Sequence, residues 1–406
     1  MKNKKEEIRF ETGCKLLDML VGGNKDTFGF PAGRFINIVG DKSAGKTFLS
    51  NEIIASAYYK YGNKKFKWVY DDCESGYSFD TESMYGFEIM PQNDEDRTHS
   101  ETVEQCFCNI KTFADKLDEG QFGIYVIDSL DGLTSSEQNE RAEERMKAFK
   151  QDKTFDKGTY GMGKQKYLSQ EFFPQLCSTI ENKNVLVIII SQIRDNVDMF
   201  SFEKFTRSGG KSMDFYAHTV LWLATAKKNI KKNIPIGVCV KAKTTKSKTP
   251  RPYRECFFNL VYDYGLDDIG TSVDYLFDLR TEKGELKSIA KAVRWKDGEK
   301  IGVNPLKSWL KEENILDEYL DSKYCDGKVA VEDVLDWVNS DKKIKEKFEN
   351  KFGVSMTRDE LISWIEDNDK QQELNERVVA KWEEIEDSVK TIRKKKYATQ
   401  LIGSDS

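Results

Sequence analysis

The residues whose types and spacing most clearly indicate chemistry form one uninterrupted run, Gly40-Asp41-Lys42-Ser43-Ala44-Gly45-Lys46-Thr47. In the pattern G-x-x-x-x-G-K-T, backbone N–H groups surround phosphate oxygens, and the helix that follows turns its positive end toward the same anion. Lys46 is placed to reach the β- and γ-phosphates, and the Thr47 hydroxyl is placed to bind Mg²⁺. The run therefore predicts a site for a nucleoside triphosphate and its magnesium ion.

The remaining parts of an ATP-hydrolysing site have candidates at the ends of predicted strands. Hydrolysis needs a second acid near the magnesium ion, an activated water and a group that senses the γ-phosphate. The candidates are Asp128 after residues 122–127, Glu74 after residues 65–70 and Gln192 after residues 185–190. Asp128 would hold Mg²⁺ through a water, Glu74 would polarise the attacking water, and Gln192 would sense the phosphate. The alternative roles are a strand cap for Asp128, a solvated turn residue for Glu74 and a structural amide for Gln192.

The elements that must position these residues alternate between strand and helix. Residues 35–39 form an apolar run before the phosphate loop, residues 46–60 have helical spacing after it, and residues 185–190 are the most apolar run of all. Nearly continuous apolar strands that alternate with helices indicate a parallel sheet covered on both faces. The carboxyl ends of such strands meet along one edge, which is where doubly wound sheets build their sites. We expect an α/β fold with a mostly parallel, twisted sheet.

Composition limits the class of protein. The 406 residues carry a net charge of −5, with 33% charged and 38% apolar residues, which is typical of a globular chain of two or three domains. Eight cysteines without C-x-x-C pairs and only two histidines make a zinc site improbable, and we expect mostly buried, reduced thiols. No apolar run is long enough to cross a bilayer and the first residues lack an apolar signal region, so we expect a cytoplasmic protein.

The chain divides into three parts by composition. Residues 1–8 read as a short tail, 9–302 as the nucleotide-binding core and 303–406 as a smaller, mainly helical domain. Within the core, residues 133–165 are highly charged and predict a helix-bearing insertion or a mobile loop. Residues 195–210 have no periodicity and exceed the usual length of a connection, which makes them a functional candidate.

The ordered motifs of the core resemble the RecA family of recombinases. Around the phosphate loop and the three strand ends, they comprise Thr12-Gly13-Cys14-Lys15-Leu16-Leu17-Asp18, residues 30–34, Asp72-Cys73-Glu74, Ile127-Asp128-Ser129, Ser191-Gln192-Ile193-Arg194, Gly209-Gly210-Lys211, Phe215-Tyr216-Ala217 and residues 243–253. The resemblance covers roughly residues 9–302. It implies a RecA-type ATPase core with ATP and Mg²⁺ as cofactors.

The resemblance assigns catalytic roles residue by residue. Glu74 matches the family's catalytic glutamate, and Gln192 matches the glutamine that couples the γ-phosphate to an adjacent DNA-binding loop. Lys246 and Lys248 match two lysines that reach across a filament interface to the neighbouring subunit's ATP. In trans, such lysines take the role that an arginine finger takes elsewhere, a contribution on the order of 10³-fold or more in rate.

The resemblance also implies two DNA-binding loops, near residues 133–165 and 195–210. The residues expected to contact DNA are Met162, Gly163, Arg194, Met199, Phe200, Phe202, Lys204, Phe205, Arg207, Gly209 and Gly210. Aromatic side chains with cations on one loop are typical of proteins that stack on single-stranded bases. The alternative is that these aromatics pack in a subunit interface.

A basic run follows the second loop region. It comprises Lys241, Lys243, Lys246, Lys248, Arg251 and Arg254. Strand alternation would place several of these cations on one face, where phosphate is a natural partner. The alternative is a solvated edge strand that lysines protect from aggregation.

Three departures from the family pattern bear on function. The family's N-terminal hook has no counterpart, the first loop region is longer, and residues 305–406 do not match the family's C-terminal domain. A bacterial or phage-infected host cytoplasm would suit such a divergent chain.

The sequence thus predicts an ATP-dependent DNA recombinase, a DNA-dependent ATPase that forms helical filaments on single-stranded DNA and pairs it with duplex DNA in recombination and repair. The first alternative is a RecA-fold ATPase with an assembly or regulatory role and no strand exchange. A DNA-binding scaffold that uses ATP as a switch and a hexameric helicase are the others.

Overall fold

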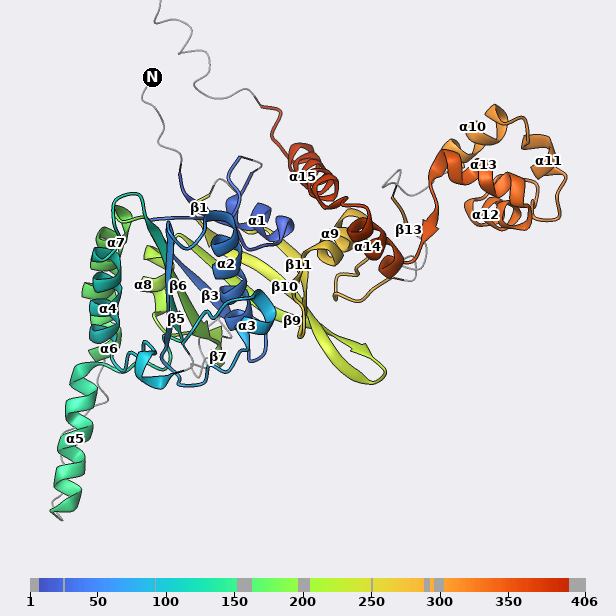
Figure 1. Ribbon diagram of the computed structural model, residues 1–406. Helices are drawn as coiled ribbons and strands as arrows, with labels where there is room; N and C mark the ends of the chain where they lie inside the picture. The colour runs from blue at the N-terminus through green and yellow to red at the C-terminus, as the bar shows by residue number, and fades with distance from the viewer. Residues whose placement is uncertain are drawn as a thin grey trace, which may run out of the picture.

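The computed structural model describes residues 7–24, 26–91, 93–151, 163–195, 205–249, 251–287, 293–295 and 303–393 (Figure 1). Its centre is an eight-stranded sheet in the order β12-β11-β10-β9-β3-β6-β5-β4. The strands are β3 (Phe35–Gly40), β4 (Phe66–Asp72), β5 (Phe122–Asp128), β6 (Val185–Gln192), β9 (Thr219–Lys231), β10 (Ile234–Ser247), β11 (Glu255–Val261) and β12 (Gly265–Asp267). Strands β9, β3, β6, β5 and β4 are parallel, and β10, β11 and β12 are antiparallel additions. The predicted α/β fold with a mostly parallel sheet is confirmed.

One face of the sheet is covered by helices α1 (Lys15–Gly22), α2 (Lys46–Tyr61) and α15 (Gln371–Ser388). Alternation along β3 explains this packing, because Ile36 and Ile38 point to this face while Phe35 and Val39 point to the other. Both sets are fully or almost fully buried, as a sheet between two helical layers requires.

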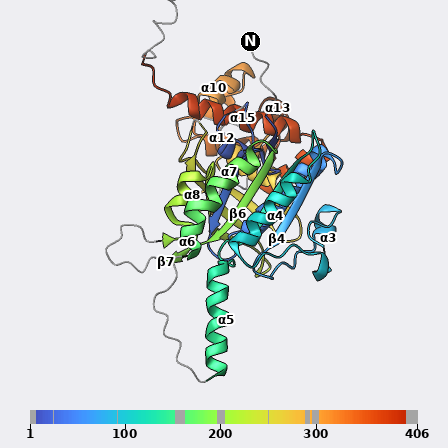
Figure 2. The ribbon, with the colours of Figure 1, turned by 90° about the vertical axis from the view of Figure 1, so that its left-hand side faces the viewer.

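The opposite face carries α4 (Val103–Asp115), α6 (Gly163–Tyr167), the π-helical turn η2 (Leu168–Phe172), α7 (Phe173–Glu181) and α8 (Gly210–Tyr216). Figure 2 shows α4, α7 and α8 side by side over this face. Phe35 of β3 stacks on Phe173 of α7, with ring centroids 5.5 Å apart. This contact fixes the layer that leads from the first loop region into β6.

Helix α5 (Ser136–Lys150) is the helix expected within residues 133–165, and it projects from the body in both views (Figures 1 and 2). It begins with a capping box in which Ser135 and Gln138 exchange hydrogen bonds between side chain and backbone. None of its residues is buried. Its helical form therefore rests on local capping and side-chain pairs rather than on a core.

The other short elements connect these layers. They are β1 (Arg9–Phe10), β2 (Phe30–Pro31), α3 (Thr81–Tyr85), η1 (Asp94–Asp96), β7 (Arg194–Asp195), β8 (Phe205–Thr206), α9 (Asp268–Leu276), β13 (Val293–Arg294) and β14 (Ser355–Met356).

The helices after residue 302 divide between two hydrophobic clusters. Helices α10 (Val303–Glu312), α11 (Leu316–Leu320), α12 (Val331–Ser340) and α13 (Lys342–Phe352) pack around Trp309 and form a lobe of their own. Helix α14 (Arg358–Asp367) instead packs on α9, and α15 places Val378 and Trp382 in the cluster that covers the sheet. The proposed domain boundary at 302/303 stays a prediction. By their packing, the last two helices, α14 and α15, belong with the core and not with the lobe.

The structure bears on two further expectations from the sequence, one for the basic run and one for the cysteines. Strand β10 is hydrogen-bonded on one side to β9 and on the other to β11, so the interpretation of the basic run as an edge strand is wrong. All eight cysteines are free, and five of them are buried.

Among the described residues, none of the helices combines the length and the apolar character that crossing a membrane requires.

Candidate functional site

The phosphate loop joins the end of β3 to the start of α2, as the sequence predicts. Its backbone takes the left-handed conformation at Ser43, with φ 58°, and at Gly45, with φ 82°. A Cβ atom at Gly45 would lie 2.2 Å from Cδ1 of Leu260 on β11. The left-handed backbone therefore favours glycine at this position, and a larger residue would also require the Leu260 side chain to move. The loop ends where the unpaired N–H groups of the first turn of α2 begin.

Lys46 lies within the loop that it would serve. Its Nζ donates hydrogen bonds to the carbonyl oxygens of Gly40, at 2.9 Å, and Asp41, at 2.8 Å. Burial lowers the pKa of Lys46, and the nearby carboxylates of Asp128 and Glu74 oppose this effect. A phosphate that entered the loop would offer this ammonium group a charged acceptor in place of two neutral carbonyls.

Thr47 and Asp128 meet at the predicted magnesium position. The Thr47 hydroxyl donates to Oδ2 of Asp128 at 2.7 Å, and the Tyr70 hydroxyl donates to the same oxygen at 2.6 Å. Burial raises the pKa of Asp128, while the hydrogen bonds from Tyr70 and Thr47 act in the opposite direction. The peptide bond between Asp128 and Ser129 is cis. The structure thus brings together the two residues that the sequence assigned to the metal.

Glu74 and Gln192 are in direct contact although they are far apart in sequence. Nε2 of Gln192 donates to Oε1 of Glu74 at 2.9 Å, and the Ser129 hydroxyl donates to the same oxygen. Strand register explains the meeting, because Asp72 lies opposite Asp128 and Gly40 lies opposite Gln192 in the parallel pairs. Glu74, the predicted catalytic glutamate, and Gln192, the predicted sensor, therefore lie at the same edge of the sheet as the phosphate loop.

Asp131 connects this edge to the second loop region. Its Oδ2 accepts the backbone N–H of Gln192 at 2.8 Å, and its Oδ1 accepts the Ser208 hydroxyl at 2.7 Å. Sequence reasoning missed Asp131, as it missed Tyr70 and Ser129. Tyr70 closes a predicted strand, and the other two follow the Ile127-Asp128 strand end, so position at a strand end was the available signal.

These residues fit a nucleotide with Mg²⁺. A hydroxyl and a carboxylate, Thr47 and Asp128, are oxygen ligands of the kind that Mg²⁺ prefers, and their contact places them at one point. The loop supplies backbone N–H groups and one ammonium group for phosphate oxygens. The donor set matches both cofactors expected from the sequence.

Lys246 and Lys248 place their ammonium groups at the carboxyl end of α8 in the same protomer. The Nζ of Lys246 donates to the carbonyl oxygens of Asp214 and Phe215, the latter at 2.7 Å, and the Nζ of Lys248 lies 3.5 Å from the carbonyl oxygen of Tyr216. Both cations thus neutralise the negative carboxyl end of this helix. Their expected action on a neighbouring subunit stays a prediction.

The residues expected to bind DNA are only partly within the described chain. Met162, Met199, Phe200, Phe202 and Lys204 lie outside the described residues. Of the others, Gly163 begins α6, and Arg194 and Phe205 belong to the short antiparallel pair of β7 and β8. The base of the expected irregular loop is therefore a two-stranded ribbon.

Arg207 is engaged within its own protomer. Its NH2 lies 2.5 Å from Oδ1 of Asp214, its guanidinium lies 5.7 Å from the ring centroid of Trp222, and its side chain is only 7% exposed. A contact between Arg207 and DNA stays a prediction, and it would require this ion pair to open.

Gly209 and Gly210 stand at the start of α8. Gly209 has φ 89° and its carbonyl accepts Nε2 of Gln165 at 3.2 Å. A Cβ at Gly209 would lie 3.0 Å from Met213, so this position combines a left-handed backbone with a close contact. The contact with Gln165 ties the end of the first loop region to the end of the second.

The basic run of β10 is largely paired with carboxylates. Nζ of Lys241 lies 2.7 Å from Glu255, and Nζ of Lys243 lies 3.9 Å from the same side chain. Arg251 and Arg254 both contact Glu386 of α15. Within one protomer these four cations therefore have acidic partners, and the phosphate partner inferred from alternation stays a prediction.

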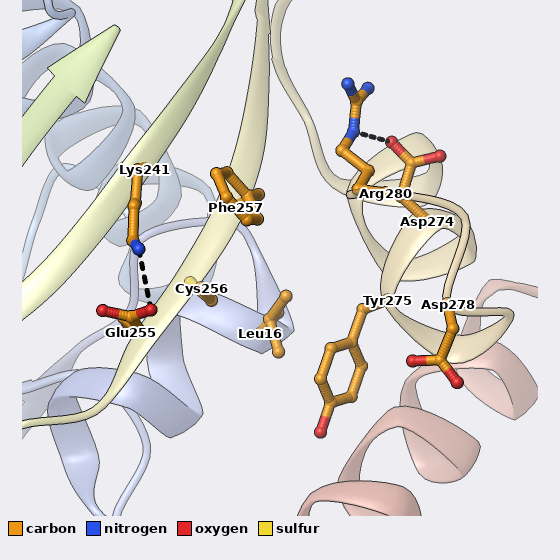
Figure 3. A pocket seen from close by; sticks show the side chains of 9 residues that line it. All are labelled: Leu16, Lys241, Glu255, Cys256, Phe257, Asp274, Tyr275, Asp278 and Arg280. Carbon is orange, nitrogen blue, oxygen red and sulfur yellow. Dashed lines mark hydrogen bonds and ion pairs between the residues drawn. The ribbon is translucent and has the colours of Figure 1, made fainter. Parts of the chain in front are cut away.

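A cavity of about 190 Å³ lies between β10, β11, α1 and α9, separate from the phosphate loop (Figure 3). Its charged walls are matched internally by ion pairs, Lys241 with Glu255 and Arg280 with Asp274, both at 2.7 Å. Asp274 also accepts Arg358 of α14 at 2.6 Å. The cavity is thus a charged junction between the sheet and the C-terminal helices.

Comparison with known proteins agrees with this geometry. The family model described as the RecA N-terminal domain matches residues 1–267. The chain is 27% identical over 263 residues to Protein RecA of Ehrlichia ruminantium (strain Gardel), covering 65% of this chain and 66% of the relative. It is 28% identical over 299 residues to Protein RecA of Leptospira meyeri, covering 72% of this chain and 67% of the relative. The match thus spans about two thirds of the relatives' length. With its phosphate loop, strand-end carboxylates and matching domain, the chain belongs to the RecA family.

Proposed function

We propose that the protein is an ATP-dependent DNA recombinase that assembles on single-stranded DNA and pairs it with homologous duplex DNA. The observation that carries this proposal is the contact between Gln192 and Glu74, because it joins a catalytic carboxylate to the strand that leads into the second loop region. Relatives named Protein RecA and the matched RecA N-terminal domain support the same assignment.

Each residue at the sheet edge has a role in hydrolysis. Lys46 and the N–H groups of the phosphate loop would hold the triphosphate, and Thr47 and Asp128 would hold Mg²⁺, Asp128 through a water. When bound, Mg²⁺ neutralises charge on the phosphate oxygens. Glu74 orients the attacking water and accepts its proton as a general base.

Coupling between ATP and DNA is supported by the links of Gln192. Its side chain contacts Glu74, its backbone N–H is held by Asp131, and Asp131 also holds Ser208 at the other end of the second loop region. A change in the position of Gln192 would therefore reach both the catalytic carboxylate and the loop. Binding of DNA by this loop would, in return, fix the Glu74 side chain.

Lys246 and Lys248 complete the site from a neighbouring protomer. Their ammonium groups lie on carbonyl oxygens of α8, which carry no full negative charge. A nucleotide at a protomer interface would be a stronger partner. Self-association into a helical filament would therefore be required for full activity.

The test is steady-state ATP hydrolysis against increasing single-stranded DNA at low salt, with Lys46→Ala as the blank. We expect strong stimulation that is cooperative in protein concentration, since DNA would assemble the interface. Lys46→Ala should lose nucleotide-dependent activity. Hydrolysis that does not respond to DNA would contradict the proposal and favour a RecA-fold ATPase with an assembly or regulatory role.

A further inference from the structure

The last described helix, α15, reaches back over the core and inserts one carboxylate beside the segment that follows Lys248. Glu386 is only 4% exposed. Its Oε1 accepts Nε of Arg254, its Oε2 accepts NH2 of Arg254 at 2.8 Å, and NH1 of Arg251 lies 3.2 Å from Oε2. A two-pronged contact of this kind fixes the orientation of an arginine side chain as well as its position.

The backbone of Arg254 is fixed in turn to Thr244 of β10. The Thr244 N–H donates to the Arg254 carbonyl at 3.0 Å, and the Arg254 N–H donates to the Thr244 hydroxyl at 3.1 Å. The Tyr253 N–H donates to the Thr244 carbonyl at 3.1 Å. Thr244 is fully buried, so these bonds are shielded from water. Glu386 thereby holds, through Arg254, the point at which β10 leaves its pairing with β11.

Lys246 lies two residues beyond this point. The pairing of β10 with β9 shifts register between Thr244 and Lys246, so the chain departs from regular strand geometry between them. At the other end, the Lys248 N–H donates to the His218 carbonyl at 2.9 Å. The segment that carries both lysines pairs with β9 at Lys246 and Ser247, and hydrogen bonds at Thr244 and at His218 hold its two ends.

The position of α15 makes this anchor depend on the C-terminal part of the chain. Trp382 and Val378 seat the helix in the same hydrophobic cluster as α1, which places Glu386 one helical turn further along, against Arg254. The hydrogen bonds from Arg254 hold the pKa of Glu386 below its ordinary value, so the pair is ionised at neutral pH. The Glu386 side chain is 5% exposed and that of Arg254 is 35% exposed, and the two hydrogen bonds between them fix the geometry of the pair.

We propose that Glu386 is a positioning residue that, through Arg254 and Thr244, sets the placement of Lys246 and Lys248 for the nucleotide site of the neighbouring protomer. This inference rests on the proposed function, because it assumes that the two lysines act in trans. Helix α15 is then a structural part of the catalytic interface, although it lies on the face of the sheet opposite α8.

The first experiment compares full-length Glu386→Gln with wild type in the DNA-stimulated ATPase assay. We expect kcat to fall roughly threefold to tenfold, with the KM for ATP and binding of a fluorescent ATP analogue unchanged, because the protomer's own nucleotide site is intact. Glu373→Gln, which removes a solvent-exposed partner of Lys370 on the same helix, is the matched control and should keep the wild-type rate.

A charge swap separates positioning from a general loss of packing. Arg254→Glu and Glu386→Arg should each lower kcat, and the double variant should recover most of it, because the pair is restored in reverse. If Glu386 only stabilises α15, thermal unfolding will change in these variants while kcat for the folded protein stays at the wild-type value. That result would overturn the inference.

Mixing variants tests action across the interface. Glu386→Gln keeps its own nucleotide site and impairs its lysines, whereas Glu74→Gln has the opposite defect. In an equimolar assembly of head-to-tail contacts, about a quarter of the interfaces join an intact site to well-placed lysines, so the rate should exceed the mean of the two variants alone.

Lys246→Ala distinguishes failure of the inference from failure of the proposed function. If Lys246→Ala is slow and gains activity with Glu74→Gln while Glu386→Gln keeps the wild-type rate, the lysines act in trans and the positioning role is rejected. If Lys246→Ala itself keeps the wild-type rate, the trans role is rejected, and the positioning role falls with it.

Discussion

At the scale of single residues, the decisive arrangement is that two donors hold Glu74. They are Gln192 at the end of β6 and Ser129 directly after β5. Gln192 and Ser129 both donate to one oxygen, which leaves Oε2 as the oxygen available to a water. A general base must be held within hydrogen-bonding distance of its water, and the two donors restrict this carboxylate to one orientation. In its proposed role as a general base, the Glu74 side chain would therefore already be oriented before a ligand binds.

Glu74→Gln should bind ATP and DNA yet hydrolyse ATP more slowly by on the order of 10²-fold or more, because the amide cannot accept the proton. The neutral side chain can still accept hydrogen bonds from Gln192 and Ser129 through its amide oxygen, so the site should keep its shape. Single-turnover hydrolysis measures the chemical step, and Lys46→Ala serves as the variant that loses binding. Undiminished turnover would remove Glu74 from its catalytic role.

The sequence was most informative at this scale where chemistry depends on strand ends. Asp128 and Gln192 could be placed because each closes a strongly apolar strand, and Glu74 because it follows the end of β4. Thr47 could be placed by the spacing of the phosphate loop, which follows β3. Tyr70, Ser129 and Asp131 could not be assigned in the same way, since a hydroxyl or carboxylate near a turn has many possible partners. Only the register of the parallel strands decides which atoms meet.

At the scale of elements, α2 is tied to its surroundings by a buried carboxylate that the nucleotide chemistry does not use. Glu52 accepts the N–H of Leu266 on β12 at 2.8 Å and the hydroxyl of Tyr85 on α3 at 2.9 Å. Burial raises its pKa from 4.5 to about 7, despite these two hydrogen bonds. The folded protein therefore holds a proton on Glu52 at a pH where the unfolded chain has released it.

This shift predicts the direction of a pH effect on stability. Because the folded pKa is raised, the contribution of Glu52 is most favourable below pH 4.5 and is lost as the pH rises through about 7. Glu52→Gln removes the titration, so its free energy of unfolding relative to wild type should improve by on the order of 3 kcal/mol between pH 4.5 and pH 7.5. Urea unfolding at both pH values measures this difference.

Glu82→Gln is the control for that measurement, since Glu82 is an exposed residue of α3. Comparison with this variant separates the effect of Glu52 from the general effect of replacing a carboxyl group by an amide. A free-energy difference between Glu52→Gln and wild type that is independent of pH would show that folding does not raise the pKa of Glu52.

Element prediction succeeded where periodicity was strong and failed where pairing was non-local. Residues 46–60 and 185–190 could be assigned by their apolar pattern, and they form α2 and β6. The basic run of β10 could be mistaken for an edge strand, because lysine-rich alternation does not reveal that Glu255 on β11 and Glu386 on α15 lie beside it. Ion pairs between segments distant in sequence leave no local signal.

At the scale of the whole molecule, the C-terminal helices serve two different units. The lobe of α10–α13 has its own hydrophobic cluster, whereas α14 and α15 complete the core. A boundary drawn by composition at residue 302 could not anticipate this division, because amphipathic helices of both kinds have the same apolar spacing. Buried contacts such as Arg358 with Asp274 decide which helix packs on the core.

Trp309→Ala should therefore loosen the lobe alone. Trp309 is fully buried and packs edge-on against Phe348, with ring centroids 5.1 Å apart, so its removal should cost the lobe about 3–5 kcal/mol. Hydrogen exchange measured by mass spectrometry should show lost protection in α10–α13 and unchanged protection in α2 and β6. Trp382→Ala, which removes a ring from the core cluster, should give the reverse pattern. Loss of protection throughout the chain in Trp309→Ala would show that the lobe and core unfold together.

The return of α15 onto α1 also sets the order in which the protein can be completed during synthesis. Residues 15–22 leave the ribosome early, but the side chains that cover them, Val378 and Trp382, are translated more than three hundred residues later. Until then a nascent chain exposes an apolar strip beside α1 and leaves Arg254 without its carboxylate. Contacts between segments so distant in sequence form late, and exposed apolar surface is where chaperones bind and aggregation begins. Translation of the α15 segment is therefore the event that closes the core.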